Sequence, residues 1–182
     1  MESDETKLIE QAQSGDPDAF EQLYELYHQP VFSYVFYRVG NQQLAEDLTG
    51  DVFVRMVSKI NTFTPGQRPF LAWLYTVAGN LVRDHMRREK RLTWLPLNER
   101  ETDGEDGLMS KIGRKIKQEQ LVAALAELTD EQRQVIVLRF IEGEPSQAVA
   151  KKLGKTLTGI KALQRRAINA LRRQLEQEGA YA

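Results

Sequence analysis

Apolar residues recur at three- and four-residue spacings along almost the whole chain, which is the period of one face of an α-helix. The clearest run lies between residues 41 and 60, where Phe53 and Val57 widen an apolar face with strict four-residue steps. Those steps are made by Leu44, Leu48, Val52, Met56 and Ile60. No segment of the sequence alternates apolar and polar residues as a half-buried strand does. The pattern therefore predicts an all-α protein.

Three helices are predicted between residues 1 and 91. The first follows Asp16-Pro17-Asp18, which offers an N-cap, a first-turn proline and a first-turn carboxylate. Pro30 should bend or break this helix, because a proline inside a helix lacks the amide donor. The second helix is the run at 41–60. Two prolines and a glycine predict a loop over residues 61–69, and a third helix then extends to a basic run at Arg87–Arg91.

The composition changes between residues 92 and 117. This stretch is rich in Gly, Asp and Glu and has no long apolar period, so we interpret it as a flexible linker. Helical period resumes near residue 118, with one helix before and one after a Thr129-Asp130 cap. We predict two small helical domains, residues 1–91 and 118–176, the second being a four-helix domain.

Residues 145–173 have the pattern of two short helices around a glycine turn. Val149, Ala150 and Leu153 form the buried face of the first helix, and Gly154 ends it. The second helix is strongly basic and of a size that fits a DNA major groove about 12 Å wide. This unit predicts a DNA-binding helix-turn-helix, and a solvated basic helix over an ordinary core is the alternative.

Charge is distributed unevenly, although the net charge is only −1. Residues 1–54 carry eleven carboxylates against Lys7 and Arg38, a net charge of minus nine. Residues 143–173 carry eight cations against one carboxylate, a net charge of plus seven. The basic end suits phosphate neutralisation, whereas the acidic front repels DNA and suits a basic protein partner.

Composition argues against several classes of protein. Without cysteine the chain can have neither a disulfide framework nor a thiolate metal site. His28 and His85 are the only histidines, and there is no glycine-rich phosphate loop. No apolar run approaches the roughly 18 residues that a membrane span needs. We therefore expect a cytosolic protein that is not an enzyme, uses no metal or cofactor and does not insert into a membrane itself.

Two runs in the first half of the chain carry a family resemblance. Residues 44–56 (LAEDLTGDVFVRM) and 70–91 (FLAWLYTVAGNLVRDHMRREKR) resemble the signature helices of bacterial sigma factors of the extracytoplasmic-function (ECF) group. Residues 124–143 (ALAELTDEQRQVIVLRFIEG), with the helix-turn-helix, resemble the promoter-binding domain of that group. The resemblance implies a dissociable cytoplasmic subunit that binds core RNA polymerase, recognises two promoter elements and opens the DNA.

The resemblance also implies protein partners. Asp47 and Asp51 form an acidic ridge beside the buried stripe, and the resemblance assigns Asp47, Asp51, Phe53 and Met56 to the clamp helices of the largest polymerase subunit. Phe53 and Met56 can equally be core residues. The family further implies contact with the flap of the second polymerase subunit, and an anti-sigma protein that wedges between or clamps the two domains.

The downstream (minus-10) element requires groups that bind single-stranded bases: stacking rings, hydrogen-bonding side chains and cations. By resemblance, the loop at 61–69 builds a pocket for a flipped base, which Asn80 helps to line. The residues assigned to this element are Asn61, Phe63, Thr64, Arg68, Asn80, Arg83, Asp84, Arg87 and Arg88. Asp84 can equally orient Arg87 or Arg88, and Trp73 is expected to pack in the core.

The upstream (minus-35) element falls to the second helix of the helix-turn-helix. Its first turn should lie against phosphate, because helix N-termini favour anions. The residues assigned to this element are Lys155, Thr156, Lys161, Ala162, Arg165 and Arg166. Ala162 stands where the family often has serine, Leu163 where it often has arginine, and Pro145 where serine is usual. These departures leave the fold intact but do not identify the promoter sequence.

Two questions stay open from sequence alone. The acidic linker can thread the polymerase channel that later carries RNA, as the family implies, or be a solvated tether. The chain can also be a stand-alone helix-turn-helix regulator that does not join the polymerase. The acidic ridge, the loop at 61–69 and Asn80 favour the sigma factor, because a repressor needs none of them.

Overall fold

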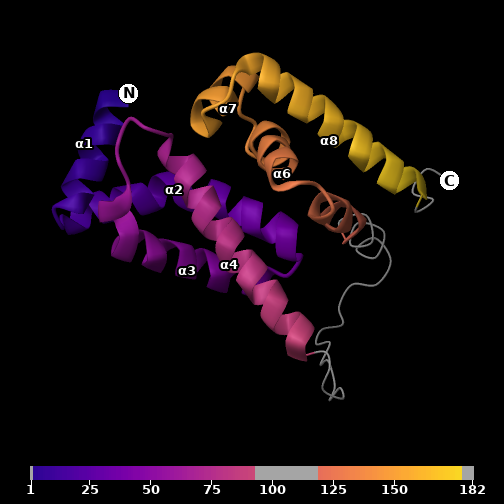
Figure 1. Cartoon of the computed structure of the whole chain (residues 1–182), viewed down its shortest axis with the longest axis horizontal. Coiled ribbons are helices and arrows are strands. Elements are labelled where there is room, and N and C mark those ends of the chain that lie inside the picture. Colours follow the sequence, from indigo (N-terminus) through magenta and orange to yellow (C-terminus); the bar gives the residue numbers. More distant parts are fainter. Residues whose placement is uncertain (1, 93–118, 178–182) are drawn as a thin grey trace, which may run out of the picture.

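The computed structural model describes residues 2–92 and 119–177 of the chain, and every regular element in these two ranges is helical. The predicted all-α fold is therefore confirmed. Most of the predicted linker, residues 93–117, lies outside the described residues. Figure 1 shows the first four helices as one group, with α6, α7 and α8 lying along one side of it.

The elements of the first range are α1 (Glu2–Gln13), α2 (Pro17–Val39), α3 (Gln42–Lys59), the short 3₁₀ turn η1 (Ile60–Thr62) and α4 (Phe70–Leu92). The second range starts with helical residues 119–126. It continues with α6 (Asp130–Ile136), the π-helical turn η2 (Val137–Ile141), α7 (Ser146–Leu153) and α8 (Leu157–Gln177). The helix pair predicted between residues 145 and 173 is thus α7 and α8.

The predicted start of α2 is confirmed in detail. The Asp16 side chain accepts a hydrogen bond from the Asp18 amide at 3.0 Å, and Pro17 occupies the first turn. Of the predicted bend or break at Pro30, the break does not occur, because α2 continues to Val39. Buried side chains hold the helix on both sides of the proline, including Leu23 before it and Val31 after it. Tertiary packing therefore outweighs the lost backbone bond.

Helix α1 was not predicted, because its sequence is mostly polar. Its buried side chains include Ile9 and Ala12, which are 3% and 1% exposed. Gln13, its last residue, donates from Nε2 to the carbonyls of Ile60 (2.9 Å) and Phe63 (2.8 Å). Helix α1 thus fixes the turn that leads from α3 into the loop at 61–69.

The two helical parts share one apolar core. Buried side chains of α2, α3 and α4 form a continuous cluster with residues of α6 to α8, namely Val135, Leu138, Val149, Ala150, Leu153 and Ile160. A smaller cluster joins the helical stretch 119–126, α6 and α8 through Leu125, Leu128, Ile136 and Ala167. Burying each large apolar side chain contributes about 1.5–3 kcal/mol. The packing of the C-terminal helices on α2 and α4 therefore contributes substantially to the free energy of folding.

Two caps set the geometry of the C-terminal helices. Thr129 and Gln132 form a reciprocal capping box at the start of α6. Gly154 has a φ of +63°, which ends α7 in the left-handed conformation that glycine favours. The Thr156 hydroxyl then accepts from the Gly159 amide at 3.1 Å as α8 begins. The turn between α7 and α8 is therefore specified by its own residues.

Candidate polymerase-binding and nucleic-acid interfaces

The loop between α3 and α4 lines a cavity that is open to solvent. Its volume is about 340 Å³, within the range of roughly 300–1,000 Å³ that small-ligand sites occupy. It is lined by Thr62, Phe63, Thr64, Gln67 and Arg68. The loop turns at Gly66, whose φ is +83°. The structure thus brings three predicted minus-10 residues, Phe63, Thr64 and Arg68, to one hollow.

Phe63 is among the residues that line this cavity, but its side chain packs inward. The residue is 4% exposed, and its ring meets the Phe70 ring edge-on, with centroids 5.1 Å apart. The Trp73 ring lies 5.4 Å from Phe63 and is itself buried, which confirms that Trp73 packs in the core. Asn61 is exposed on the preceding turn. The cavity therefore lies beside a packed aromatic cluster and is lined mainly by exposed polar residues.

The predicted minus-10 residues of α4 form a separate polar face. Asn80, Arg83, Asp84, Arg87 and Arg88 are all exposed. Arg83 donates from Nη2 to the Asn80 side-chain oxygen at 2.7 Å, and Arg87 lies 3.9 Å from Asp84. Asn80 is not among the residues that line the cavity. In this conformation the structure does not bring Asn80 and the loop into one pocket.

Asp130, which the sequence analysis treated only as part of a helix cap, pairs with this face of α4. Its Oδ2 accepts from Nη1 of Arg83 at 2.8 Å. Its Oδ1 accepts from Nη1 of Arg133 at 2.9 Å and from the Tyr34 hydroxyl at 3.2 Å. Arg83 and Asp130 are 47 residues apart, so no local pattern could have indicated the pair.

Arg133 is the largest of the fully buried side chains, with 1% of its surface exposed. Its guanidinium donates to the carbonyls of Leu125 (3.0 Å), Ala126 (3.0 Å) and Leu128 (2.5 Å). Burial lowers the pKa of Arg133, partly offset by the nearby Tyr34 and Asp130. One cation thus satisfies the backbone carbonyls where the stretch 119–126 turns into α6.

In the described part of the chain Tyr34 and Tyr75 are buried and Tyr27 is partly buried, and these tyrosines should resist ionisation. Burial, followed by the charge of Asp130, raises the pKa of Tyr34 to about 12. Burial also raises the pKa of Tyr75, and burial with a hydrogen bond to Glu5 raises that of Tyr27. These groups favour the folded state fully below their unfolded pKa of about 10, and their contribution is lost as the pH rises above it. For Tyr34 this contribution to the free energy of unfolding is about 3 kcal/mol at most.

We therefore expect tyrosinate absorbance from these three residues to rise together with alkaline unfolding above pH 10. An alkaline titration that records near-ultraviolet absorbance and far-ultraviolet circular dichroism on one sample measures both. Complete ionisation of all six tyrosines of the chain while the helical signal is unchanged would contradict the burial.

The acidic ridge on α3 is present and solvent-accessible. Asp47 and Asp51 are exposed, and Gln43 donates to Asp47 at 3.5 Å. Phe53 and Met56 are only 6% and 1% exposed, so both pack in the core in this structure. Of the four predicted polymerase-binding residues, the two of the acidic ridge are therefore exposed, and Phe53 and Met56 are buried beneath them in the core.

The second half of α3 adds an exposed apolar surface that the sequence analysis missed. Val57 was expected to widen the core-facing side, and that prediction is wrong because it is 52% exposed. Val54 is 69% exposed. Tyr24 of α2, 44% exposed, packs edge-on against Phe53 with centroids 4.8 Å apart. Periodicity misplaced Val57 because it lies at the edge of the buried stripe.

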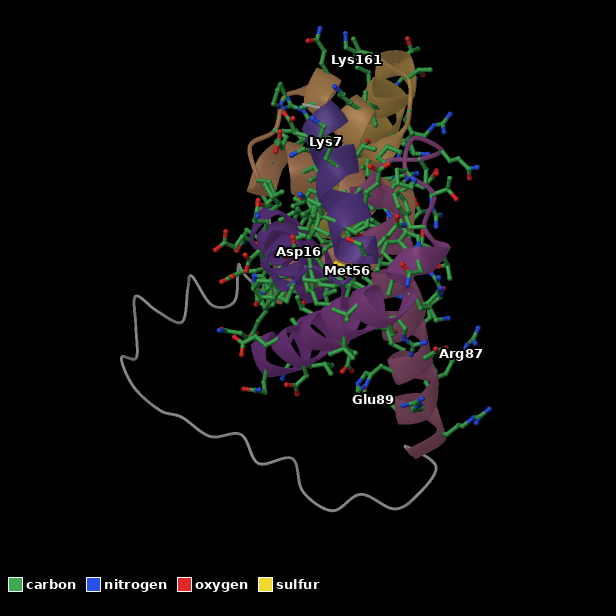
Figure 2. All side chains as sticks on the ribbon, turned by 90° about the vertical axis from the view of Figure 1, so that its left-hand side faces the viewer. Lys7, Asp16, Met56, Arg87, Glu89 and Lys161 are labelled. Atoms are coloured by element: carbon green, nitrogen blue, oxygen red, sulfur yellow. The ribbon has the colours of Figure 1, made fainter. Side chains whose placement is uncertain are left out.

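The predicted minus-35 residues lie on or just before α8. Lys161, Arg165 and Arg166 are exposed, and Ala162 is half-buried. Figure 2 shows Lys161 reaching into solvent near one end of the molecule, well away from Arg87 on α4. Lys155 donates from Nζ to Oε1 of Glu131 at 2.5 Å. The two predicted DNA surfaces are thus distinct, and one cation of the second is already paired.

His85 lies 3.3 Å from Glu89, one turn along α4. No group of three or more His, Cys, Asp or Glu side chains in the two described ranges could hold a metal ion. Within those ranges, no helix has the length and apolar character needed to cross a membrane.

Comparisons with known proteins agree with this layout. The family model for Sigma-70 region 2 matches residues 23–92, and that for Sigma-70 region 4 matches residues 124–173. The ECF RNA polymerase sigma factor BldN of Streptomyces coelicolor is 39% identical over 93% of this chain, which spans 65% of BldN. The ECF RNA polymerase sigma factor SigW of Bacillus subtilis is 30% identical over 93% of this chain and 95% of SigW. The solved structure of CnrH in complex with the cytosolic domain of CnrY matches with a TM-score of 0.60 and 25% identity, covering 95% of this chain and 97% of that one.

Proposed function

Because this chain belongs to the ECF group of RNA polymerase sigma factors, we propose that it binds core RNA polymerase, directs it to specific promoters and promotes DNA opening. The observation that carries the proposal is the pairing of the two family matches with two distinct polar surfaces, one on each helical part. In this role the protein acts by binding rather than by catalysis. It would act in the bacterial cytoplasm, where RNA polymerase works.

The loop cavity supports a role in opening the minus-10 element. An unstacked base entering it would meet the exposed side chains of Thr64 and Arg68, which the packed Phe63 supports from inside. Extruding a base from the duplex costs a few kcal/mol, and contacts available only to the extruded base offset that cost. Arg87 and Arg88 on α4 supply exposed cations for the phosphates alongside. Binding energy at the cavity thus drives strand separation.

The recognition helix α8 supports a role at the minus-35 element. Lys155 and Thr156 stand at its N-terminal end, where the helix dipole favours a phosphate. Lys161, Arg165 and Arg166 project from the exposed face, and arginine pairs well with guanine edges in the major groove. Helix α8 therefore anchors the protein on duplex DNA while α4 and its loop act on the opened strand.

Removal of two of these cations should weaken upstream binding in a salt-dependent way. If Arg165 and Arg166 both contact phosphates, Arg165→Ala with Arg166→Ala should reduce the slope of log K against log salt by about 1.8. Fluorescence anisotropy on duplex promoter DNA at several salt concentrations measures the slope. The control, Arg172→Ala with Arg173→Ala, removes two exposed cations further along α8. Equal slopes for the two double variants would argue that all four arginines act only as diffuse charge.

The exposed surfaces also support two protein partners. Asp47 and Asp51 suit a basic surface such as the clamp helices of the largest polymerase subunit, and the neighbouring Val54 and Val57 add apolar area to the same contact. We further propose control by an anti-sigma protein. The support is the relative CnrH, which was solved in complex with the cytosolic domain of CnrY.

The deciding experiment is run-off transcription with purified bacterial core polymerase on fragments of the source genome, with and without this protein. New transcripts that begin at shared promoter motifs are expected. If the folded protein binds DNA but produces none, it is a stand-alone regulator instead, and its operator can be mapped from the bound fragments.

A further inference from the structure

One glycine of α3 is required by nothing in the described part of the chain. Gly50 is exposed in the middle of the helix, and a Cβ added there would meet no atom within 4 Å. Its φ is not positive, unlike that of Gly66, so other residues could adopt its backbone conformation. A glycine inside a helix nevertheless weakens the helix relative to alanine. Gly50 is therefore a destabilising residue that neither backbone geometry nor internal packing demands.

Gly50 lies at the centre of the exposed face of α3. The exposed residues of this face follow one another at steps of four, three, four and three positions, and they are Gln43, Asp47, Gly50, Val54 and Val57. These steps place the five residues, named here the α3 seam, on one stripe of the helix. The same alternation of steps marks the residues through which two helices pack in a coiled coil. The α3 seam therefore suits a partner that is itself a helix.

Charge indicates what kind of helix fits the α3 seam. Asp47 and two flanking carboxylates, Glu46 and Asp51, are exposed within about one turn of Gly50. One turn further along the seam, Val54 is 69% exposed. Charged residues beside a helix seam select the charge of the partner helix. The partner that complements this surface is a basic helix with some apolar area facing α3.

The missing side chain leaves the backbone of α3 accessible at the centre of the seam. In a helix pair, each side chain of one helix fits into the space between four residues of the other. At Gly50 α3 itself fills none of that space, so a partner helix can approach closely or insert a large side chain. Phe53, one turn along α3, is buried and packs against the Tyr24 ring with centroids 4.8 Å apart. Because Phe53 is held in the core, it does not fill the space.

We infer that Gly50 is the seat for a large side chain of a basic partner helix, which packs along the α3 seam with its backbone close to that of α3. The inference rests on the proposed function, which makes core RNA polymerase the partner of α3. It adds that the contact depends on an absent side chain. Any side chain at position 50 would occupy the seat and hold the partner helix away.

Substitutions at Gly50 should change stability and binding in opposite directions. Gly50→Ala and Gly50→Leu each place a good helix former at an exposed position, so each should raise the melting temperature by about 2–4 °C. The added atoms occupy the seat, and forcing extra atoms into a close-packed contact is unfavourable. The affinity for core polymerase should therefore fall about tenfold for alanine and further for leucine. Thermal unfolding followed by circular dichroism gives the melting temperature, and titration of the labelled full chain with core polymerase gives the dissociation constant.

Ser58→Ala is the control on the same helix. Ser58 is exposed, lies outside the α3 seam, and donates its hydroxyl only to the carbonyl of Arg55 within α3. The substitution adds no atom to the surface, so the affinity for polymerase should stay unchanged. A loss as large as that of Gly50→Ala would overturn a seat localised at Gly50.

The outcomes distinguish this inference from the proposed function. If both Gly50 variants are more stable and bind polymerase as tightly as the unchanged protein, the seat is overturned. A weakening by Asp47→Ala with Asp51→Ala would in that case still keep α3 as the contact helix. If this double variant also binds normally, the placement of polymerase on α3 fails as well. A lower melting temperature for Gly50→Ala would show that the glycine serves the fold, and that result would overturn the inference too.

Discussion

Replacing Arg133 by methionine is expected to destabilise the folded protein by about 3–5 kcal/mol, because three backbone carbonyls lose their charged donor and each polar group left unsatisfied costs about 1–3 kcal/mol. Methionine fills similar space but donates no hydrogen bond. The carbonyls of Leu125, Ala126 and Leu128 would lose their side-chain donor, and Asp130 would lose one of its cations. Urea unfolding followed by circular dichroism measures the change in free energy of unfolding.

The control for this variant is Arg139→Met. Arg139 lies in η2 and also donates to a backbone carbonyl, that of Glu144 at 2.5 Å, but it is only half-buried. Water can replace its hydrogen bonds, so a loss of about 1 kcal/mol is expected. Similar losses for the two variants would mean that the carbonyls around Arg133 become hydrated at little cost.

Removing the acidic ridge with Asp47→Ala and Asp51→Ala should weaken binding to core RNA polymerase by about 10- to 100-fold. Truncating charges that pair across an interface costs about 2–5 kcal/mol when the pair is desolvated, and less when it stays at the rim. The fold should persist, because both side chains are exposed on α3. Titration of labelled protein with core polymerase gives the dissociation constant, and circular dichroism checks the helical content.

Glu21→Ala with Glu25→Ala is the matched control for the ridge. These residues are also exposed carboxylates four positions apart, but they lie on α2. The control removes the same charge at the same spacing, so its affinity for polymerase should stay near that of the unchanged protein. If both double variants bound polymerase equally well, α3 would not be the contact helix.

Helical periodicity was sufficient to predict α3, α4 and the pair α7 and α8, because each buries a wide apolar stripe on a regular face. It failed for α1, where only a few apolar side chains, such as Ile9 and Ala12, mark the buried side. Proline chemistry alone also allowed a break at Pro30, which does not occur because packing around Val31 and Tyr34 keeps α2 continuous. Local sequence preferences failed where tertiary packing contributed more free energy than the local preference opposed.

The polar residues of the candidate interfaces were easier to predict than the aromatic and apolar ones. Charged side chains such as Asp47 and Arg165 are exposed, because burying an unpaired charge is costly. Phe53 could pack inward or face a partner with equal chemical plausibility, and Phe63 was assigned to DNA, but the structure shows both packed inward. The Arg83–Asp130 pair depends on how two distant helices dock, which a single sequence does not encode in any local pattern.

The single side chain of Gln13 links the amino-terminal helix to both edges of the turn before the cavity, through the carbonyls of Ile60 and Phe63. Proteolytic trimming of the first 13 residues, or a bulky fusion that displaces them, would release those carbonyls and loosen the packing of Phe63 beside the cavity. If the cavity acts on the opened strand as proposed, we expect such changes to alter strand opening without altering any residue assigned to DNA contact.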